Sequence, residues 1–163
     1  MNKLIKLSKG KVAIIDKRDL DKVKRFSWYA AIGNRGKYYA RAYIRKEVGK
    51  YSSIYMHRLL VGVKTGDKVQ VDHRNSNTLD NRRCNLRRAS NAQNSMNRKK
   101  QAGFTSRFKG VAWEKECCCW RAQIMVNKKA IYLGRFNSEA DAARCYNKKA
   151  KEIFGEYALL NNI

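Results

Sequence analysis

The feature that most constrains this chain is a polar stretch, from Val71 to Arg98, that is too rich in Asn, Ser, Asp and Arg to form a hydrophobic core. The residues that lead into it, Lys68–Val71, predict a strand, and Cys84–Ala89 predicts a strand that returns. A Ser–Gln capping box then predicts that a helix begins near Asn91. The stretch therefore favours an α+β fold in which two short strands and a helix surround a polar loop.

This arrangement would bring four polar side chains together: Asp72, His73, Asn85 and Asn94. A carboxylate and an amide oxygen are hard ligands that suit Mg²⁺ or Mn²⁺. An imidazole with a near-neutral pKa can take a proton from an attacking water, and an amide bonded to its other nitrogen would fix the tautomer. The group therefore suits metal-assisted hydrolysis of a phosphodiester.

The same stretch resembles the HNH endonuclease motif in the H-N-N variant of homing enzymes. The matching signature is D-H, then L-D-N-R-R-x-N-L-R, then an Asn nine residues after the Asn of N-L-R. The resemblance covers roughly residues 3–98. It implies a ββα-metal nuclease domain that cleaves DNA with a single divalent metal ion, Mg²⁺ or Mn²⁺, and a histidine general base.

The resemblance also implies a role for each residue of the group. Asp72 and Asn94 would bind the metal, His73 would be the catalytic base, and Asn85 would orient His73. The family usually carries Gly in the turn where this chain has Ser76, and Ser tolerates fewer backbone conformations.

Basic residues flank this group in the sequence. His57 and Arg58, in the similar segment M-H-R-L-L, are candidates for phosphate contact, although a buried structural role suits His57 equally well. Beside a phosphate-cutting centre, phosphate contact is also expected of the basic run Arg82, Arg83, Arg87, Arg88, Arg98, Lys99 and Lys100. Asn77 and Asn81 fit turn positions better than ligand positions.

The net charge agrees with a polyanionic partner. Lys and Arg number 37 against 13 acidic residues, a formal charge of +24, and most of the excess lies in residues 1–100. A surface this positive favours nucleic acid, with a merely basic protein as the alternative. Apolar runs stay far below the ~20 residues of a membrane span, and the N-terminal segment lacks the apolar core of a signal peptide. We therefore expect a cytoplasmic protein, of a bacterial host or phage-encoded.

The cysteines give a weaker indication. There are five of them, three consecutive at Cys117–Cys119, and no C-x-x-C pair. With only two histidines, a structural zinc site is not expected, and reduced thiols are the simplest interpretation.

Alternating and periodic patterns predict the remaining elements. In the first block these are strands near residues 4–7 and 12–16, a helix capped by Asp19, a half-buried strand at 37–44 and a short helix at 56–61. In the second block, runs at 108–113, 120–126 and 130–136 predict a three-stranded antiparallel sheet, followed by a helix from Ser138 to Gly155. We expect a nuclease domain with an N-terminal strand and helix extension at 1–100, a linker at 101–105 and a second domain at 106–163.

Residues 106–161 resemble the AP2 DNA-binding domain, through F-K-G-V, W-R-A-Q-I, Y-L-G-R-F, A-A-R-C-Y and A-L-L-N. The resemblance implies a sheet that enters the major groove of DNA. Alternation from Trp120 places Ala122 and Ile124 inward and leaves Met125 outward. The residues expected to contact DNA are Lys109, Arg121, Gln123 and Tyr132. Ala112, Glu114 and Ala130 stand near positions where plant members carry arginine, so their target sequence is not transferred.

The sequence supports two hypotheses about function. The first is a site-selective, homing-type DNA endonuclease, and the second is a non-catalytic DNA-binding regulator with a decayed HNH site. The four intact site residues favour the enzyme, and no RNA-binding motif occurs. The expected partner is double-stranded DNA, with no membrane and no protein partner implied. A monomer would nick one strand and a dimer could cut both, and the sequence leaves the oligomeric state open.

Overall fold

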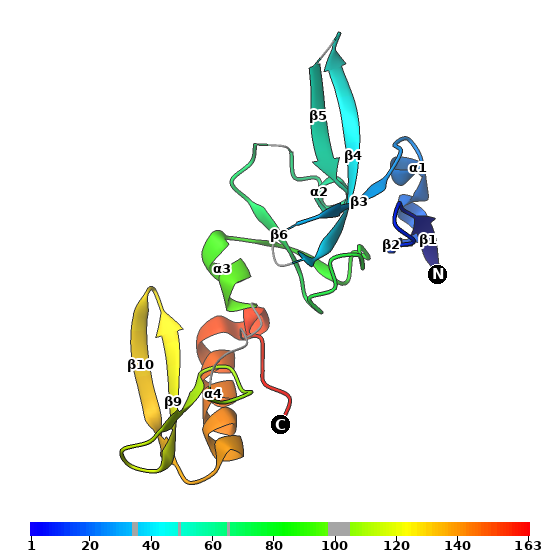
Figure 1. Ribbon diagram of the computed structural model, residues 1–163. Coiled ribbons are helices and arrows are strands. Elements are labelled where there is room, and N and C mark those ends of the chain that lie inside the picture. Colours follow the sequence, from blue (N-terminus) through cyan, green and yellow to red (C-terminus); the bar gives the residue numbers. More distant parts are fainter. Residues whose placement is uncertain (34–35, 49, 65, 98–104) are drawn as a thin grey trace. The chain divides into compact units, whose positions relative to one another are not determined.

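The computed structural model is a mixed α+β protein of several small antiparallel sheets and a few helices, which confirms the expected α+β class (Figure 1). It divides into two compact units, Met1–Asn91 and Ala92–Ile163, and each is described by itself. The structure describes residues 1–33, 36–48, 50–64, 66–97 and 105–163. The predicted linker therefore lies outside the described residues, apart from Thr105.

The first unit begins with an antiparallel pair, β1 (Asn2–Lys6) and β2 (Val12–Asp16). Ala13 and Ile15 of β2 are fully buried, as a half-buried strand requires. A 3-10 turn (Lys17–Asp19) and the short helix α1 (Leu20–Val23) follow. The predicted cap is wrong, because the side chain of Asp19 makes no capping bond and instead binds an arginine distant in sequence.

A three-stranded sheet follows, made of β3 (Tyr29–Ile32), β4 (Tyr38–Glu47) and β5 (Lys50–Tyr55) in that order. The alternation predicted for β4 is confirmed, because Ala40 and Ala42 are buried while Tyr43 is 62% exposed. The sequence analysis missed β5, which forms a long hairpin with β4 (Figure 1). Helix α2 (Met56–Val61) then ends at Gly62, whose φ of 72° suits a left-handed cap.

Strands β6 (Gln70–His73) and β7 (Leu86–Ala89) pair antiparallel, with Asp72 opposite Arg87. The predicted strand and its return are thus present, although β6 extends through His73 instead of stopping before it. Helix α3 (Asn91–Met96) begins at the predicted residue and, except for its first residue, belongs to the second unit. The apolar core of the first unit joins these strands to β2, α1 and α2 through Ile15, Val23, Met56, Leu60, Val71 and Leu86.

The second unit contains a three-stranded antiparallel sheet, in the order β10-β9-β8, and a long helix (Figure 1). Its elements are β8 (Val111–Glu114), β9 (Cys119–Val126), β10 (Lys129–Phe136), α4 (Glu139–Phe154) and a 3-10 turn (Gly155–Tyr157). Ser138 caps α4 by accepting a hydrogen bond from the backbone N–H of Asp141, as predicted. Ala122 and Ile124 are buried against α4, which confirms the alternation expected for β9.

No helix in the described part of the chain is both long enough and apolar enough to span a membrane.

Gly110 is a point of close approach in the second unit. Its φ is +76°, and an added Cβ would lie 2.1 Å from Cδ2 of Tyr146 and 2.6 Å from the carbonyl oxygen of Gln123. We expect Gly110→Ala to lower the free energy of unfolding by about 3 kcal/mol, because neither the buried ring nor the strand can move away. Urea denaturation, followed by tryptophan fluorescence, measures this change.

The control is Gly10→Ala, since Gly10 has a similar φ of +63° but the described part of the chain places no atom within 4 Å of the added Cβ. Only the backbone penalty of about 1 kcal/mol should remain there. Equal losses in the two variants would contradict the packing argument for Gly110.

Candidate active site

His73 is the last residue of β6 and is only 5% exposed. Its Nε2 lies 3.5 Å from Oδ1 of Asn81, a side chain with no exposed surface. Nδ2 of Asn81 donates to the carbonyl oxygen of Leu79, which fixes Oδ1 as the atom that faces the ring. Since Oδ1 can only accept, Nε2 carries the proton and Nδ1 is the basic nitrogen.

The environment of His73 keeps its imidazole neutral. Burial lowers the pKa of His73, while the contact with Asn81 and the charges of Asp72 and Asp80 oppose that shift. A neutral imidazole with one fixed tautomer can accept a proton, which is what a general base requires.

Asn85 lies in the loop between β6 and β7 and organises its backbone. Its Oδ1 accepts from the N–H of Asn75 at 2.9 Å, and its Nδ2 donates to the carbonyl of Asp80 at 2.7 Å. Both ends of the amide are therefore used within the loop. The contact with the His73 ring that the sequence analysis expected of Asn85 is made by Asn81, which it had treated as a turn residue.

Asp72 is held by Arg87 across the β6–β7 pair. Nε and Nη2 of Arg87 donate to Oδ2 of Asp72 at 2.9 and 2.6 Å, and both side chains are buried. Arg87 was expected to contact phosphate, but it is buried and its guanidinium neutralises this carboxylate instead. Removing one member of such a buried pair costs more than the pair itself contributes, so Arg87 is committed to Asp72.

The donors fit a hard divalent cation in their chemistry. Asp72 offers carboxylate oxygen and sits next to His73, and Asn94 would add an amide oxygen. Asn94 lies on α3 in the second unit, so the structure describes it separately from Asp72.

Two more arginines of the loop bind buried carboxylates. Arg82 donates to both oxygens of Asp80 at 2.7 and 2.6 Å, and Arg83 donates to both oxygens of Asp19 at 2.8 and 2.6 Å. The two carboxylates are 2% and 1% exposed. These hydrogen bonds lower the pKa of Asp80 and of Asp19, so both stay ionised. Both arginines are about one-third exposed, and their guanidinium groups are held in these ion pairs.

His57 lies beside His73, with 5.1 Å between the ring centroids, in contact with Tyr39 and Tyr55. Burial lowers its pKa to about 3, and its Nδ1 has no hydrogen-bond partner among the residues that the structure describes. His57 is therefore neutral and brings no charge to a phosphate. Arg58 donates to the carbonyls of Lys64, Asp67 and Val69, so its guanidinium holds the segment that leads into β6.

Comparison with known proteins identifies the family. A family model described as HNH endonuclease matches residues 54–96, which run from the end of β5 to the end of α3. An uncharacterized HNH endonuclease of Acanthamoeba polyphaga mimivirus is 30% identical over 161 residues, which are 98% of this chain and 80% of the viral protein. The chain belongs to the HNH endonuclease family. Membership indicates a nuclease that acts on DNA, and such nucleases generally use a divalent metal.

A second likeness is shorter. APETALA2-like protein 2 of Oryza sativa, from both the indica and japonica subspecies, is 39% identical over 69 residues. The match covers 39% of this chain and only 16% of the rice protein.

Two of the remaining predicted DNA contacts of this HNH endonuclease, Arg121 and Tyr132, lie on the β8–β10 sheet. Tyr132 is 58% exposed and stands opposite Gln123 in the register. Arg121, from the same face, forms an ion pair with Glu114. Lys109 differs, because its Nζ donates to the carbonyl of Met96 and burial lowers its pKa to about 8. Lys109 is therefore tied to its own unit. Arg88 is exposed and donates to the carbonyl of Val61.

The Asp19–Arg83 pair predicts a pH-dependent stability. A carboxylate whose pKa is lowered by folding stabilises the protein above its ordinary value of 3.8, and this contribution disappears as the pH falls through the lowered pKa. We expect Arg83→Met to reduce the free energy of unfolding by about 2 kcal/mol at neutral pH. The gap to the wild type should shrink steadily in urea titrations at pH values below 3.8.

The matched control is Lys24→Met, because Lys24 pairs with Asp21 on the surface, where both side chains are well exposed. Its stability should barely change at any pH. A gap for Arg83→Met that stayed constant down to strong acid would show that the ion pair is not its cause.

Proposed function

We propose that this chain is a site-selective, homing-type DNA endonuclease in which His73 is the general base. The observation that supports this role most strongly is the contact between Nε2 of His73 and Oδ1 of Asn81. It holds the proton of the imidazole on Nε2, while burial favours the neutral ring, so Nδ1 is the nitrogen that would accept the proton of an attacking water. A decayed site would have no reason to retain this arrangement inside a buried polar network.

The residues around His73 position the loop and would bind the metal ion. Asn85 and the Asp80–Arg82 pair hold the loop, and Arg87 fixes the carboxylate of Asp72. By family resemblance, Asp72 and Asn94 are the proposed ligands of a single Mg²⁺ or Mn²⁺ ion. When bound, that ion would stabilise negative charge on the scissile phosphate and on the leaving 3′ oxygen.

The proposed role of the second unit is to choose where the cut falls. We assign it as an AP2-like DNA-binding domain, supported by the sheet with one long helix and by the short likeness to the rice proteins. The face of the sheet opposite α4 carries Arg121, Gln123 and Tyr132, which can reach base edges in a major groove. One HNH site per chain would nick DNA as a monomer, and the proposed setting is the cytoplasm of a bacterial or phage-infected cell.

The alternative function is a DNA-binding regulator without catalysis. It would use the same sheet and the same positive charge, so binding alone does not separate the two functions. Cleavage of a DNA strand distinguishes them, because only the endonuclease would show it.

Plasmid nicking tests the catalytic proposal. We expect the wild type to relax supercoiled plasmid in Mg²⁺ or Mn²⁺, and His73→Ala to do so about 10²–10⁴-fold more slowly, because the proton acceptor is lost. DNA binding by the variant, measured by gel shift, should be unchanged. A wild type that binds plasmid but never nicks it would support the regulator, and equal nicking by His73→Ala would remove His73 from the mechanism.

Arg121→Ala tests the role of the sheet. Sequencing the ends produced on a phage genome would first define the preferred site. We expect the variant to lose about tenfold in discrimination between that site and a random duplex, since one base-reading side chain contributes about 1–3 kcal/mol.

Arg144→Ala is the matched control for Arg121→Ala. Arg144 is also paired with a carboxylate, but it lies on α4 and is 64% exposed. Equal changes in the two variants would mean that Arg121 acts only through general charge.

A further inference from the structure

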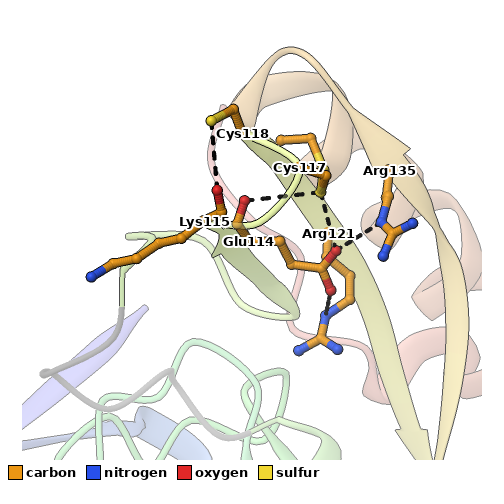
Figure 2. The surroundings of a disulfide bond; sticks show 7 residues. Glu114, Lys115, Cys117, Cys118, Arg121 and Arg135 are labelled. Atoms are coloured by element: carbon orange, nitrogen blue, oxygen red, sulfur yellow. Dashed lines mark hydrogen bonds and ion pairs between the residues drawn. A yellow bond between two sulfur atoms is a disulfide. The ribbon is translucent and has the colours of Figure 1, made fainter.

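We propose that Glu114, Cys117 and Cys119 form a binding site for a thiophilic divalent cation, such as Zn²⁺, when the two cysteines are reduced. Glu114 ends β8 and Cys117 lies in the β8–β9 turn (Figure 2), while Cys119 is the first residue of β9. Within the described part of the chain, this is the one group of three His, Cys, Asp or Glu side chains whose ligand atoms all lie within 4.8 Å of one another. The sequence analysis did not expect zinc because it looked for C-x-x-C, whereas here a C-x-C pair gains a carboxylate through the fold.

The distances match the coordination of such an ion. Sγ of Cys117 lies 3.5 Å from Oε2 of Glu114. Zinc–sulfur and zinc–oxygen bonds of about 2.3 and 2.0 Å, at a tetrahedral angle, place the two ligand atoms about 3.5 Å apart. The Cα atoms of Cys117 and Cys119 are 5.4 Å apart, which allows both thiolates to reach one ion. A water molecule would complete four ligands.

The turn selects two of its three cysteines. Cys118 has a φ of +45°, so the chain reverses there and its neighbours face the same side. Its own Sγ lies 3.5 Å from the carbonyl oxygen of Lys115 and points away from Cys117 (Figure 2). Cys118 is therefore exposed and excluded from the site, which makes it a natural internal control.

Two arginines orient the carboxylate. Oε1 of Glu114 lies 3.2 Å from Nε of Arg121, and Oε2 lies 2.7 Å from Nε of Arg135 (Figure 2). A cation bound at Oε2 would compete with Arg135, whose side chain is 58% exposed and can turn into solvent. Arg121 can keep its contact with Oε1. The carboxylate is thus held toward the cysteines while one of its oxygens remains exchangeable.

The site depends on the redox state, because Cys117 and Cys119 are joined by a disulfide in the structure. A dithiol reductant would supply two electrons and two protons: the protein S–S bond breaks, two thiols form, and the reductant becomes a disulfide. Binding of the cation then releases the two thiol protons to solvent. The disulfide and the cation therefore exclude each other, and two thiolate ligands select a soft ion over Mg²⁺.

Cobalt provides a direct test on the full-length protein. The chain is reduced with a dithiol, freed of the reductant and titrated with Co²⁺, while the thiolate-to-cobalt charge-transfer absorption is recorded in the near ultraviolet. We expect the band to saturate at a single equivalent, to disappear on addition of Zn²⁺ and to be absent from the oxidised chain. A metal held by oxygen ligands at the HNH site gives no such band, so it does not interfere.

Variants identify the ligands. Cys117→Ser and Cys119→Ser should each weaken cobalt binding by more than about tenfold, and Glu114→Gln should weaken it as well. Cys118→Ser and Cys84→Ser should bind like the wild type, since Cys84 lies in the first unit. Fluorescence of Trp113 and Trp120, whose rings are in contact, confirms that each variant keeps its sheet. A reduced wild type without the band, an oxidised chain with it, or an equal band after both cysteines are replaced would overturn the proposal.

Discussion

Three carboxylate–arginine pairs determine the geometry of the β6–β7 loop, and the candidate base depends on that loop. Asp72–Arg87 joins the two strands, Asp80–Arg82 closes the loop, and Asp19–Arg83 ties it to the N-terminal segment. Removing the arginine would leave an unpaired carboxylate at each of these buried positions, so each guanidinium is held by its carboxylate. These three ion pairs fix the loop, and the contact between His73 and Asn81 forms within it.

Because these arginines are paired with carboxylates, only part of the positive charge is available to bind a polyanion. The excess of +24 indicates a polyanionic partner, but Arg82, Arg83 and Arg87 each bind a buried carboxylate of the fold. A run of basic residues does not reveal which of them are paired, because the acidic partner can be far away: Asp19 lies 64 residues before Arg83. The contact of His73 also depends on a residue distant in sequence, because the backbone N–H of its partner Asn81 donates to the carbonyl oxygen of Ile14.

Local patterns, by contrast, predicted much of the fold. The alternation of β4 and β9, the start of α3 and the cap of α4 each depend on residues within a few positions of one another, so the sequence contains them. The cap at Asp19 failed because a distant arginine offers that carboxylate a stronger interaction than a helix N-terminus does. At Ser76 the turn has a positive φ of +61°, which explains why the family usually has glycine there.

Both units use guanidinium groups to orient a carboxylate that could bind a metal. In the first unit, Nε and Nη2 of Arg87 both donate to Oδ2 of Asp72, beside a neutral imidazole. In the second, Arg121 and Arg135 hold Glu114 beside two sulfur atoms. The carboxylate is common to both, so its neighbours decide which cation is preferred: oxygen donors favour Mg²⁺ or Mn²⁺, and thiolates favour Zn²⁺. With both proposed sites, the protein would therefore select Mg²⁺ or Mn²⁺ at Asp72 and Zn²⁺ at Glu114 by ligand type alone.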